Sequence, residues 1–218
     1  MVLNAIMSRK SVRVYCDKEV TNDTVKSIIE AGMNAPSWVN VQPWQFIVVR
    51  DDAKKEILSQ ASGGQQQVKN ASALICCVAD MTAWENSKFS KVMEKQGRNA
   101  SVRDYILNSD VLNPSRLGEF ETLLRTVEQM SYAIGYMTLR AEELGVASCI
   151  VGAIANELTR SNDGMSVSVK ELLGLNDKQV LLSILTLGYE EDKKISEKSR
   201  KDFDEVASLE VLGQKFTV

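Results

Sequence analysis

Two short clusters of cations and hydroxyl groups, one near each end of the chain, have the chemistry of a phosphate-binding site. The first contains Arg9, Lys10, Ser11 and Arg13, and the second is the segment KKISEKSRK at residues 193–201. Guanidinium groups bind phosphate oxygens in bidentate fashion, and serine adds a neutral donor. Either cluster alone is more typical of a solvated surface. A phosphate site therefore requires a fold that brings the two clusters together.

The composition excludes several kinds of catalytic machinery. The chain has no histidine, so neither a Ser-His-Asp arrangement nor an HExxH zinc site can be built. Its four cysteines form no CxxC pair, and buried thiols in a reducing cytoplasm explain them without a metal. If the protein is an enzyme, we expect a bound cofactor to supply the reactivity.

The segment NAPSWVNVQPWQF, residues 34–46, concentrates stiff and bulky side chains. It holds two of the three prolines and two of the three tryptophans. Such residues form a rigid wall at low conformational cost, and Ser37 and Asn40 offer hydrogen bonds along it. By itself, such a segment is most plainly a packed turn between a helix and a strand. We expect Trp44 and Phe46 to point into the core.

Alternating helices and apolar strands must position these residues, which predicts a mixed α and β fold. Helix patterns lie at residues 21–35, 51–60 and 166–174, and strand patterns at 45–50, 72–80, 147–152 and 179–188. The run SALICCVAD is apolar throughout, as in a central strand buried on both faces, so Cys76 and Cys77 should point to opposite faces. No repeat or linker marks a boundary, and we expect residues 1–218 to form a single domain.

The clearest helix pattern covers residues 117–144, with an apolar stripe from Phe120 to Leu144 and Gly145 suited to a left-handed cap. Small and aromatic residues also lie between the members of the stripe. This indicates either a subunit interface or a central core helix. The preceding residues 84–115 are polar and weakly periodic, which predicts a lid or a pair of short helices over a site.

The charge and the hydropathy pattern limit the partners. A net charge of −3 over 218 residues disfavours a general nucleic-acid or anionic-membrane surface. No apolar run is long enough to span a bilayer, and the N-terminus lacks the apolar core of a signal peptide. We expect a cytoplasmic protein with neither nucleic-acid nor membrane partners.

Four motifs, in this order and spacing, resemble the FMN-dependent nitroreductase family. They are RKSVR at residues 9–13, APSWVNVQPWQF at 35–46, SCIVGA at 148–153 and LGYEEDKKISEKSRK at 187–201. Each is short, but together they extend over nearly the whole chain. The resemblance implies an α+β fold with a central, mostly antiparallel sheet flanked by helices. It also implies an intertwined homodimer with FMN in the interface, in which residues 202–218 wrap around the partner subunit.

The family pattern, carried over by position, implies cofactor contacts from both subunits. The phosphate and the ribityl chain would be held by cationic and hydroxyl residues from both termini: Arg9, Lys10, Ser11, Arg13, Lys198 and Arg200. The backbone amides of Val151 and Gly152 would face the N5 and O4 edge of the flavin. The rigid segment of the partner subunit would add four further contacts: Pro36, Ser37, Trp38 and Asn40. The pattern includes no metal and no catalytic side chain.

Two positions depart from the family pattern. Trp38 stands where a small residue is common, so it would either narrow the mouth of the pocket or stack on a substrate. In ASGGQQQVKNAS the family often has an asparagine, whereas this chain has Gln65, Gln66 and Gln67. A glutamine amide could reach the same flavin atoms, and we assign this contact to Gln65.

The activity implied by the resemblance is ping-pong electron transfer. NADH or NADPH would pass hydride to the flavin N5, and an electron-poor acceptor such as a nitroaromatic or a quinone would then receive the electrons. Trp84, Phe89 and Tyr105 would either lie over the flavin ring or pack locally. The alternatives are a non-catalytic flavin-binding or storage protein, and an enzyme of the same fold with another reaction, such as reductive dehalogenation.

Overall fold

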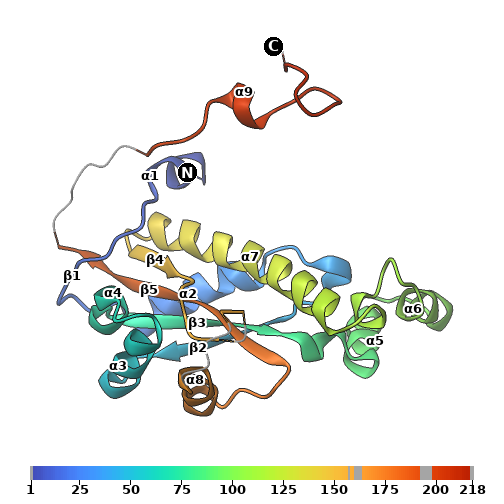
Figure 1. Cartoon of the computed structure of the whole chain (residues 1–218), viewed down its shortest axis with the longest axis horizontal. Coiled ribbons are helices and arrows are strands. Elements are labelled where there is room, and N and C mark those ends of the chain that lie inside the picture. The colour runs from blue at the N-terminus through green and yellow to red at the C-terminus, as the bar shows by residue number, and fades with distance from the viewer. Residues whose placement is uncertain (1, 157, 160–163, 192–197, 217–218) are drawn as a thin grey trace.

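The computed structural model describes residues 2–156, 158–159, 164–191 and 198–216 (Figure 1). Its sheet is built from five antiparallel strands: β1 (Tyr15–Cys16), β2 (Trp44–Val49), β3 (Ala73–Asp80), β4 (Ala147–Val151) and β5 (Gln179–Glu190). The order is β1-β5-β3-β2, and β4 also pairs with β5. This confirms the predicted α+β fold with a mostly antiparallel central sheet.

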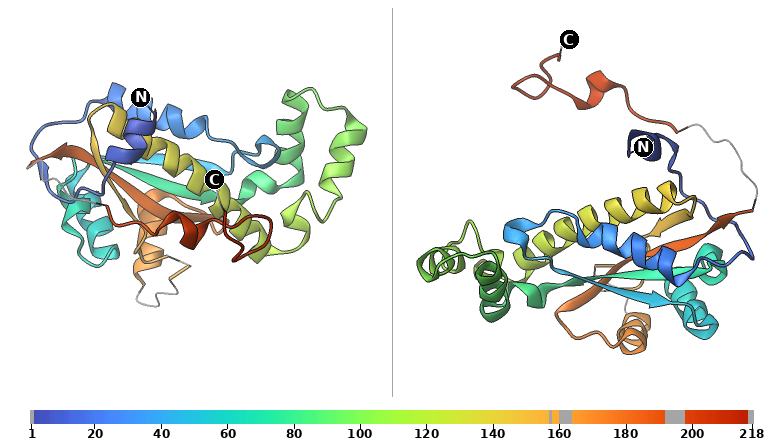
Figure 2. Two further views of the ribbon diagram at one scale, coloured as in Figure 1. Left: turned by 90° about the horizontal axis from the view of Figure 1, so that it is seen from above. Right: turned by 180° about the vertical axis from the view of Figure 1, so that it is seen from behind.

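Helices cover both faces of this sheet (Figures 1 and 2). They are α1 (Val2–Ser8), α2 (Asn22–Met33), α3 (Asp52–Ala61), α4 (Gln66–Asn70), α5 (Asn86–Lys95), α6 (Ala100–Leu107), α7 (Glu119–Glu143), α8 (Met165–Leu173) and α9 (Phe203–Val206). The core cluster with α3, α4 and α8 includes Cys76, and the cluster with α2 and α7 includes Cys77. The two thiols therefore lie on opposite faces of β3, as predicted.

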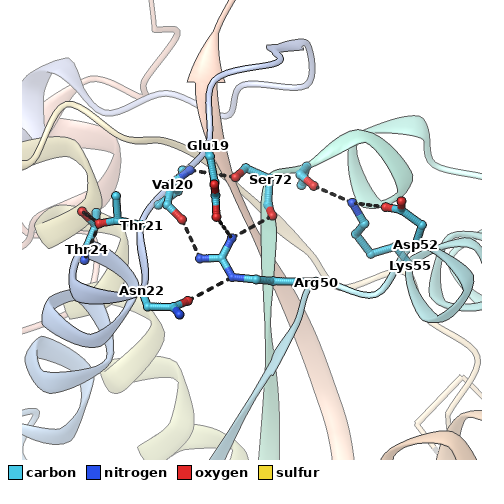
Figure 3. Close-up of polar contacts among 10 residues, drawn as sticks. Glu19, Val20, Thr21, Asn22, Thr24, Arg50, Asp52, Lys55 and Ser72 are labelled. Carbon is cyan, nitrogen blue, oxygen red and sulfur yellow. Dashed lines mark hydrogen bonds and ion pairs between the residues drawn. The ribbon is translucent and has the colours of Figure 1, made fainter.

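Side-chain contacts fix where the helices begin and how the N-terminal segment meets the sheet. The Thr21 hydroxyl caps α2 and the Asp51 carboxylate caps α3. Arg50, at the end of β2, donates hydrogen bonds to the Val20 and Ser72 carbonyls and to the Asn22 side chain (Figure 3). This guanidinium ties the chain that leads into α2 to the edge of the sheet.

The long helix α7 is buried differently along its length. Met130, Ile134 and Met137 face the core as predicted. The first turns do not face the core, since Phe120 is 71% exposed and Leu124 is 58% exposed in the single chain, so the alternative of a subunit interface stays open for them. The buried face of these turns carries polar residues instead, such as Thr122 and Thr126. They contact residues 81–118 through hydrogen bonds, for example from Trp84 Nε1 to Thr126 Oγ1 (2.8 Å).

The predicted pair of short helices before α7 is present as α5 and α6. Trp84 and Phe89 are fully buried there and stack edge to face, with ring centroids 5.5 Å apart. Local packing is therefore the correct interpretation of these two aromatics, whereas Tyr105 on α6 is exposed. A third small cluster, which also contains Val41, forms the core of this region.

The two ends of the chain lie on the same side of the molecule. Helix α1 lies over α7, and residues 198–216, which include α9, stand away from the sheet and its helices in both side views (Figures 1 and 2). Within the described residues, no helix combines the length and the apolar character that crossing a bilayer requires.

Candidate functional site

The fold brings the first basic cluster and residues 198–201 of the second together beside the last turn of α1, whereas residues 193–197 of the second cluster lie outside the described residues. Lys198 Nζ donates hydrogen bonds to the carbonyl oxygens of Ile6 and Met7. Partial desolvation lowers the pKa of Lys198 below its usual value, and the positive charges of Arg9 and Arg200 lower it further. The carboxylate of Glu142 on α7 raises the pKa of Lys198. Three cations from opposite ends of the sequence thus share one small region.

The first cluster runs alongside β4. The Val12 amide donates to the Ser148 carbonyl (3.0 Å), and Ser11 forms a parallel bridge with Ser148. Burial raises the pKa of the Cys149 thiol, while Arg13, the Ser11 hydroxyl and Arg9 lower it. Arg9, Ser11 and Arg13 therefore all lie close to Cys149 on β4.

Lys10 points to the edge of the sheet. Its ammonium forms an ion pair with Glu190 on β5 at 2.8 Å. Because this carboxylate already takes up part of the charge, Lys10 is less suited to a phosphate than the arginines on either side of it. Its assignment to the cofactor stays a prediction.

A cavity of about 400 Å³ lies between α7 and the ends of β4 and β5. Most of its lining is apolar: Val127, Ser131, Ile134, Gly135, Ile150, Gly152, Asn156, Leu158, Thr159, Leu182 and Ser183. Gly152 lies at its rim, whereas the side chain of Val151 is buried in the core on the α3 face. Val151 can therefore offer a ligand only its backbone. No heavy atom lies within 4 Å of where a Cβ on Gly135 would stand, so the helix leaves open space there.

The cavity and the cations lie at opposite ends of β4. From Ser148, beside the cations, to Gly152, at the cavity, the strand rises about 13 Å at its usual 3.3 Å per residue. Helix α7 runs from the cations to the cavity beside β4, because α1 packs on α7 and Ile134 and Gly135 of α7 line the cavity. The arrangement suits an elongated ligand with an anionic end and a planar apolar end.

The rigid segment, residues 34–46, lies far from the cations in the folded subunit. Its 3-10 turn η1 (Trp38–Asn40) packs against α5, at the end of the molecule far from β1 (Figure 1). A single subunit therefore does not bring Ser37 or Asn40 to the cations. Pro36 and Asn40 are exposed, and the Ser37 hydroxyl accepts a hydrogen bond from the Gln42 amide (3.0 Å), which leaves its own proton available.

The indole of Trp38 does not project freely into solvent. Its Nε1 donates to the Leu112 carbonyl (2.9 Å), and its backbone amide donates to Gln129 Oε1 (2.7 Å). The guanidinium of Arg125 lies 5.2 Å from the ring centroid. The side chain is thus held between residues 107–112 and α7.

The three glutamines differ in how their amides are used. Gln65 donates to the Ser62 carbonyl and accepts from Gln67, so both ends of its amide have local partners. Gln66 is exposed and bonds only the Gly64 carbonyl through its side chain in the described part of the chain. The flavin contact assigned to Gln65 stays a prediction.

Sequence reasoning missed some residues that shape the site. Asn156 lines the cavity and holds its loop through bonds to the Leu181 carbonyl and to the amides of Leu158 and Thr159. Gly135 also lines the cavity, and the signal in the sequence is that glycine is unfavourable in a helix interior and so indicates a need for space. Among the described residues, no group of three or more Cys, Asp or Glu side chains is placed to hold a metal ion.

Comparison with known proteins identifies the family. The sequence profile of the Nitroreductase family matches residues 6–189 of this chain. The chain therefore belongs to the nitroreductase family.

Individual relatives and a solved structure agree with this assignment. An Archaeoglobus fulgidus protein named among the NADH dehydrogenase/NAD(P)H nitroreductases is 30% identical over 192 residues, covering 88% of this chain and 87% of its own. The Bacillus subtilis FMN reductase [NAD(P)H] is 26% identical over 192 residues, covering 88% and 67%. A nitroreductase-like protein of Streptococcus mutans has the same fold, with a TM-score of 0.80 at 20% identity over 95% of this chain and 97% of its own.

Proposed function

We propose that this protein is an FMN-dependent oxidoreductase that moves electrons from NADH or NADPH to an electron-poor acceptor, such as a nitroaromatic or a quinone. The observation that carries the proposal is the convergence of Arg9, Lys198 and Arg200 at one end of β4, with an apolar cavity at the other end. The relative named FMN reductase [NAD(P)H] supports both the cofactor and the donor.

The residues present fit this cofactor. Arg9, Ser11, Arg13, Lys198 and Arg200 would bind the phosphate, since a dianion relieves the repulsion that lowers the pKa of Lys198. The open space beside Gly135 would accept the edge of a planar ring. Backbone amides at Val151 and Gly152 would donate to the polar rim of that ring.

When bound, FMN would supply the redox chemistry, accepting hydride at N5 and releasing electrons to a second substrate that takes the donor's place. The chain would contribute binding, orientation and electrostatics. The cations hold the anionic end in place, the cavity walls formed by α7 and β5 exclude water from the apolar end, and amide dipoles favour negative charge at the rim. No side chain is required as a general acid or base, which agrees with the absence of histidine.

A homodimer would complete the site. Pro36, Ser37, Trp38 and Asn40 of the partner subunit would form the second wall, because within one chain the η1 turn packs against α5, at the end of the molecule far from β1 (Figure 1). An exposed ridge on α7, made of Phe120, Leu124, Tyr132 and Tyr136, gives the partner an apolar surface to cover.

The state of the thiols indicates the cellular compartment, and the net charge indicates the kind of partner. All four cysteines are unpaired, which is typical of a reducing compartment, and we place the enzyme in the cytoplasm. With a net charge of −3, its partners are small molecules and a second copy of the chain, not nucleic acid or a membrane.

Titration of the flavin-free protein with FMN, followed by quenching of the flavin fluorescence, tests the proposal. Arg200→Ala removes a charge-assisted hydrogen bond worth about 1.5–3 kcal/mol, so affinity should fall about 10- to 100-fold. Lys201→Ala is the matched control, because it removes the same charge one residue further along an exposed segment. Equal affinity of Arg200→Ala and wild type, or no binding by wild type, would contradict the proposed site.

A further inference from the structure

The backbone of residues 37–42 is held in a conformation that costs free energy. Val39, Asn40 and Gln42 have φ values of 49°, 58° and 51°, in the left-handed region that favours glycine. For Val39 this is most unfavourable, since its side chain is β-branched. Such strain persists only where surrounding structure imposes it. The question is which contacts impose it here.

Bonds within the segment are too local to be sufficient. The Asn40 and Val41 amides donate to the Ser37 and Trp38 carbonyls, at 2.9 Å each, which closes a single tight turn. A turn of this kind is only marginally stable by itself, because ordering each residue costs conformational entropy.

The remaining contacts come from residues 84–118 and from α7. The Trp38 indole donates to the Leu112 carbonyl, and Gln96 Nε2 at the end of α5 donates to the Val39 carbonyl (3.0 Å). Val41 is buried in the same cluster as Trp84, Phe89, Met93 and Ile106. On the α7 side, the buried Gln129 accepts the Trp38 amide. The strained turn is thus bonded on both sides of Val39.

We infer that residues 84–118 act as a brace that holds the 37–42 segment in its left-handed conformation, and that Trp38 is the positioning residue through which the brace acts. A mobile lid would have few contacts with the segment beside it, whereas this region shares a core and two hydrogen bonds with it. The inference rests on the proposed function only in making the braced segment a wall of the flavin site.

The brace has a consequence for ligand binding. If only the ordered form of the segment contacts the flavin, apparent affinity scales with the fraction of molecules in that form. Hydrogen exchange reports the small open fraction, so a variant can lose protection while the ordered fraction, and with it the flavin affinity, hardly changes. Bound flavin, which would contact only the ordered form, should slow exchange of the segment.

Amide hydrogen exchange on the full-length protein tests the brace. Trp38→Phe keeps an aromatic ring but removes the donor to Leu112, and we expect the amides of residues 40–42 to exchange about tenfold faster. Exchange of β3 should be unchanged. Tyr105→Phe is the matched control, because it removes a hydroxyl from the same helical region at an exposed position. Unchanged exchange at 40–42, or equal acceleration in β3, would overturn the brace.

A second substitution separates strain from simple loss of packing. Val39→Gly and Val39→Ala, each introduced into Trp38→Phe, both remove the packing of Val39 on the small cluster, but only glycine adopts φ 49° without steric cost, so protection at 40–42 should be higher with glycine. Equal or lower protection with glycine would mean that strain is not what the brace opposes. If Trp38→Phe folds poorly, Gln96→Ala removes only the bond to the Val39 carbonyl and should give a smaller increase confined to 40–42.

Hydrogen exchange of the same variants with and without FMN separates the inference from the proposed function. Faster exchange of Trp38→Phe without FMN, together with slower exchange at 40–42 once FMN is bound, supports both. Faster exchange of Trp38→Phe with no slowing of 40–42 by FMN, in the variant or in wild type, supports the brace but contradicts a flavin wall at 37–42.

Discussion

At the residue scale, the site is defined by charges that lack full compensation. Lys198 is fixed by two carbonyls of α1, so its charge stays close to Arg9 and Arg200. Like charges held together favour any dianion that enters, and this effect weakens with salt because Arg200 is exposed and Arg9 and Lys198 are only half-buried. Lys10 contributes less because Glu190 already pairs with it.

The cysteines give a residue-scale prediction that is independent of the flavin. Burial raises the pKa of Cys76 to about 12 and also raises that of Cys77, so both stay neutral and inaccessible at pH 8. Cys149 is also buried, and Cys16 is half-buried. A thiol reagent should therefore label Cys16 first, and Cys16→Ser should remove the fast phase. Rapid labelling of two or more thiols per native chain would contradict the buried positions.

The raised pKa of Cys76 determines how the free energy of unfolding changes with pH. Because the folded-state pKa of Cys76 exceeds the ordinary value of 9.0, the thiol ionises first in the unfolded chain. Its contribution to the free energy of unfolding is present below pH 9 and is lost as the pH rises toward 12. Cys76→Ala should thus reduce the loss of stability between these pH values, measured by urea unfolding.

At the element scale, α7 serves both the core and a second surface. The exposed residues Phe120, Leu124, Tyr132 and Tyr136 follow one i±4n row, so neighbours in the row lie side by side, and the row winds slowly around the helix. A partner that covers this ridge buries aromatic and aliphatic surface, which contributes about 1.5–3 kcal/mol per large side chain.

The ridge predicts the effect of a charge on dimerisation. Leu124→Glu should weaken the dimer at least about 100-fold, because burial of an unpaired carboxylate adds to the loss of apolar contact. Val167→Glu is the matched control, since Val167 is also exposed but lies on α8, at the opposite face of the sheet. Sedimentation velocity over a range of concentrations measures the outcome, and an unchanged dimer in Leu124→Glu would exclude this face.

Elements were predictable from the sequence where apolar patterning is strong. SALICCVAD could only be a strand buried on both faces, and β3 has that burial throughout. The sequence could not show that Phe120 and Leu124 at the start of α7 are exposed in the single chain, because an exposed apolar ridge has the same composition as one that faces the core. Residues 84–115 look polar in sequence, yet Trp84 and Phe89 form a small core that periodicity did not indicate.

At the scale of the whole molecule, Lys198 contacts α1 beside α7, and the C-terminal segment that follows stands away from the body in the right-hand view of Figure 2. Phe203 and Phe216 stack edge to face at 5.6 Å, so the segment has a small contact of its own. Most of its apolar residues are exposed, including Leu212 at 96%. We interpret this segment as one that packs on the partner subunit.

Truncation after Lys201 tests that interpretation. The sheet and its helices should keep their circular dichroism spectrum, because residues 202–216 contribute no strand to the sheet. Dimer affinity and Tm should both fall. A shortened chain that dimerises as tightly as the full chain would show that the tail does not cover the partner.

The candidate site was only partly predictable from the sequence, because part of it is assembled by elements that meet only in the folded molecule. Arg9, Arg13 and Arg200 could be selected because short motifs carry phosphate chemistry. Gly135 and Asn156 could not, since their role depends on a cavity assembled by elements far apart in the sequence. The tie from Trp38 to Leu112 likewise joins residues more than seventy positions apart.

The most direct measurement is the absorbance spectrum of the purified protein during anaerobic addition of NADH or NADPH, followed by a nitroaromatic or quinone acceptor. The proposed function predicts a yellow protein whose oxidised-flavin band disappears with the nicotinamide and returns with the acceptor through many cycles. A colourless protein that does not take up added FMN, or a bound flavin that neither nicotinamide reduces, would contradict it.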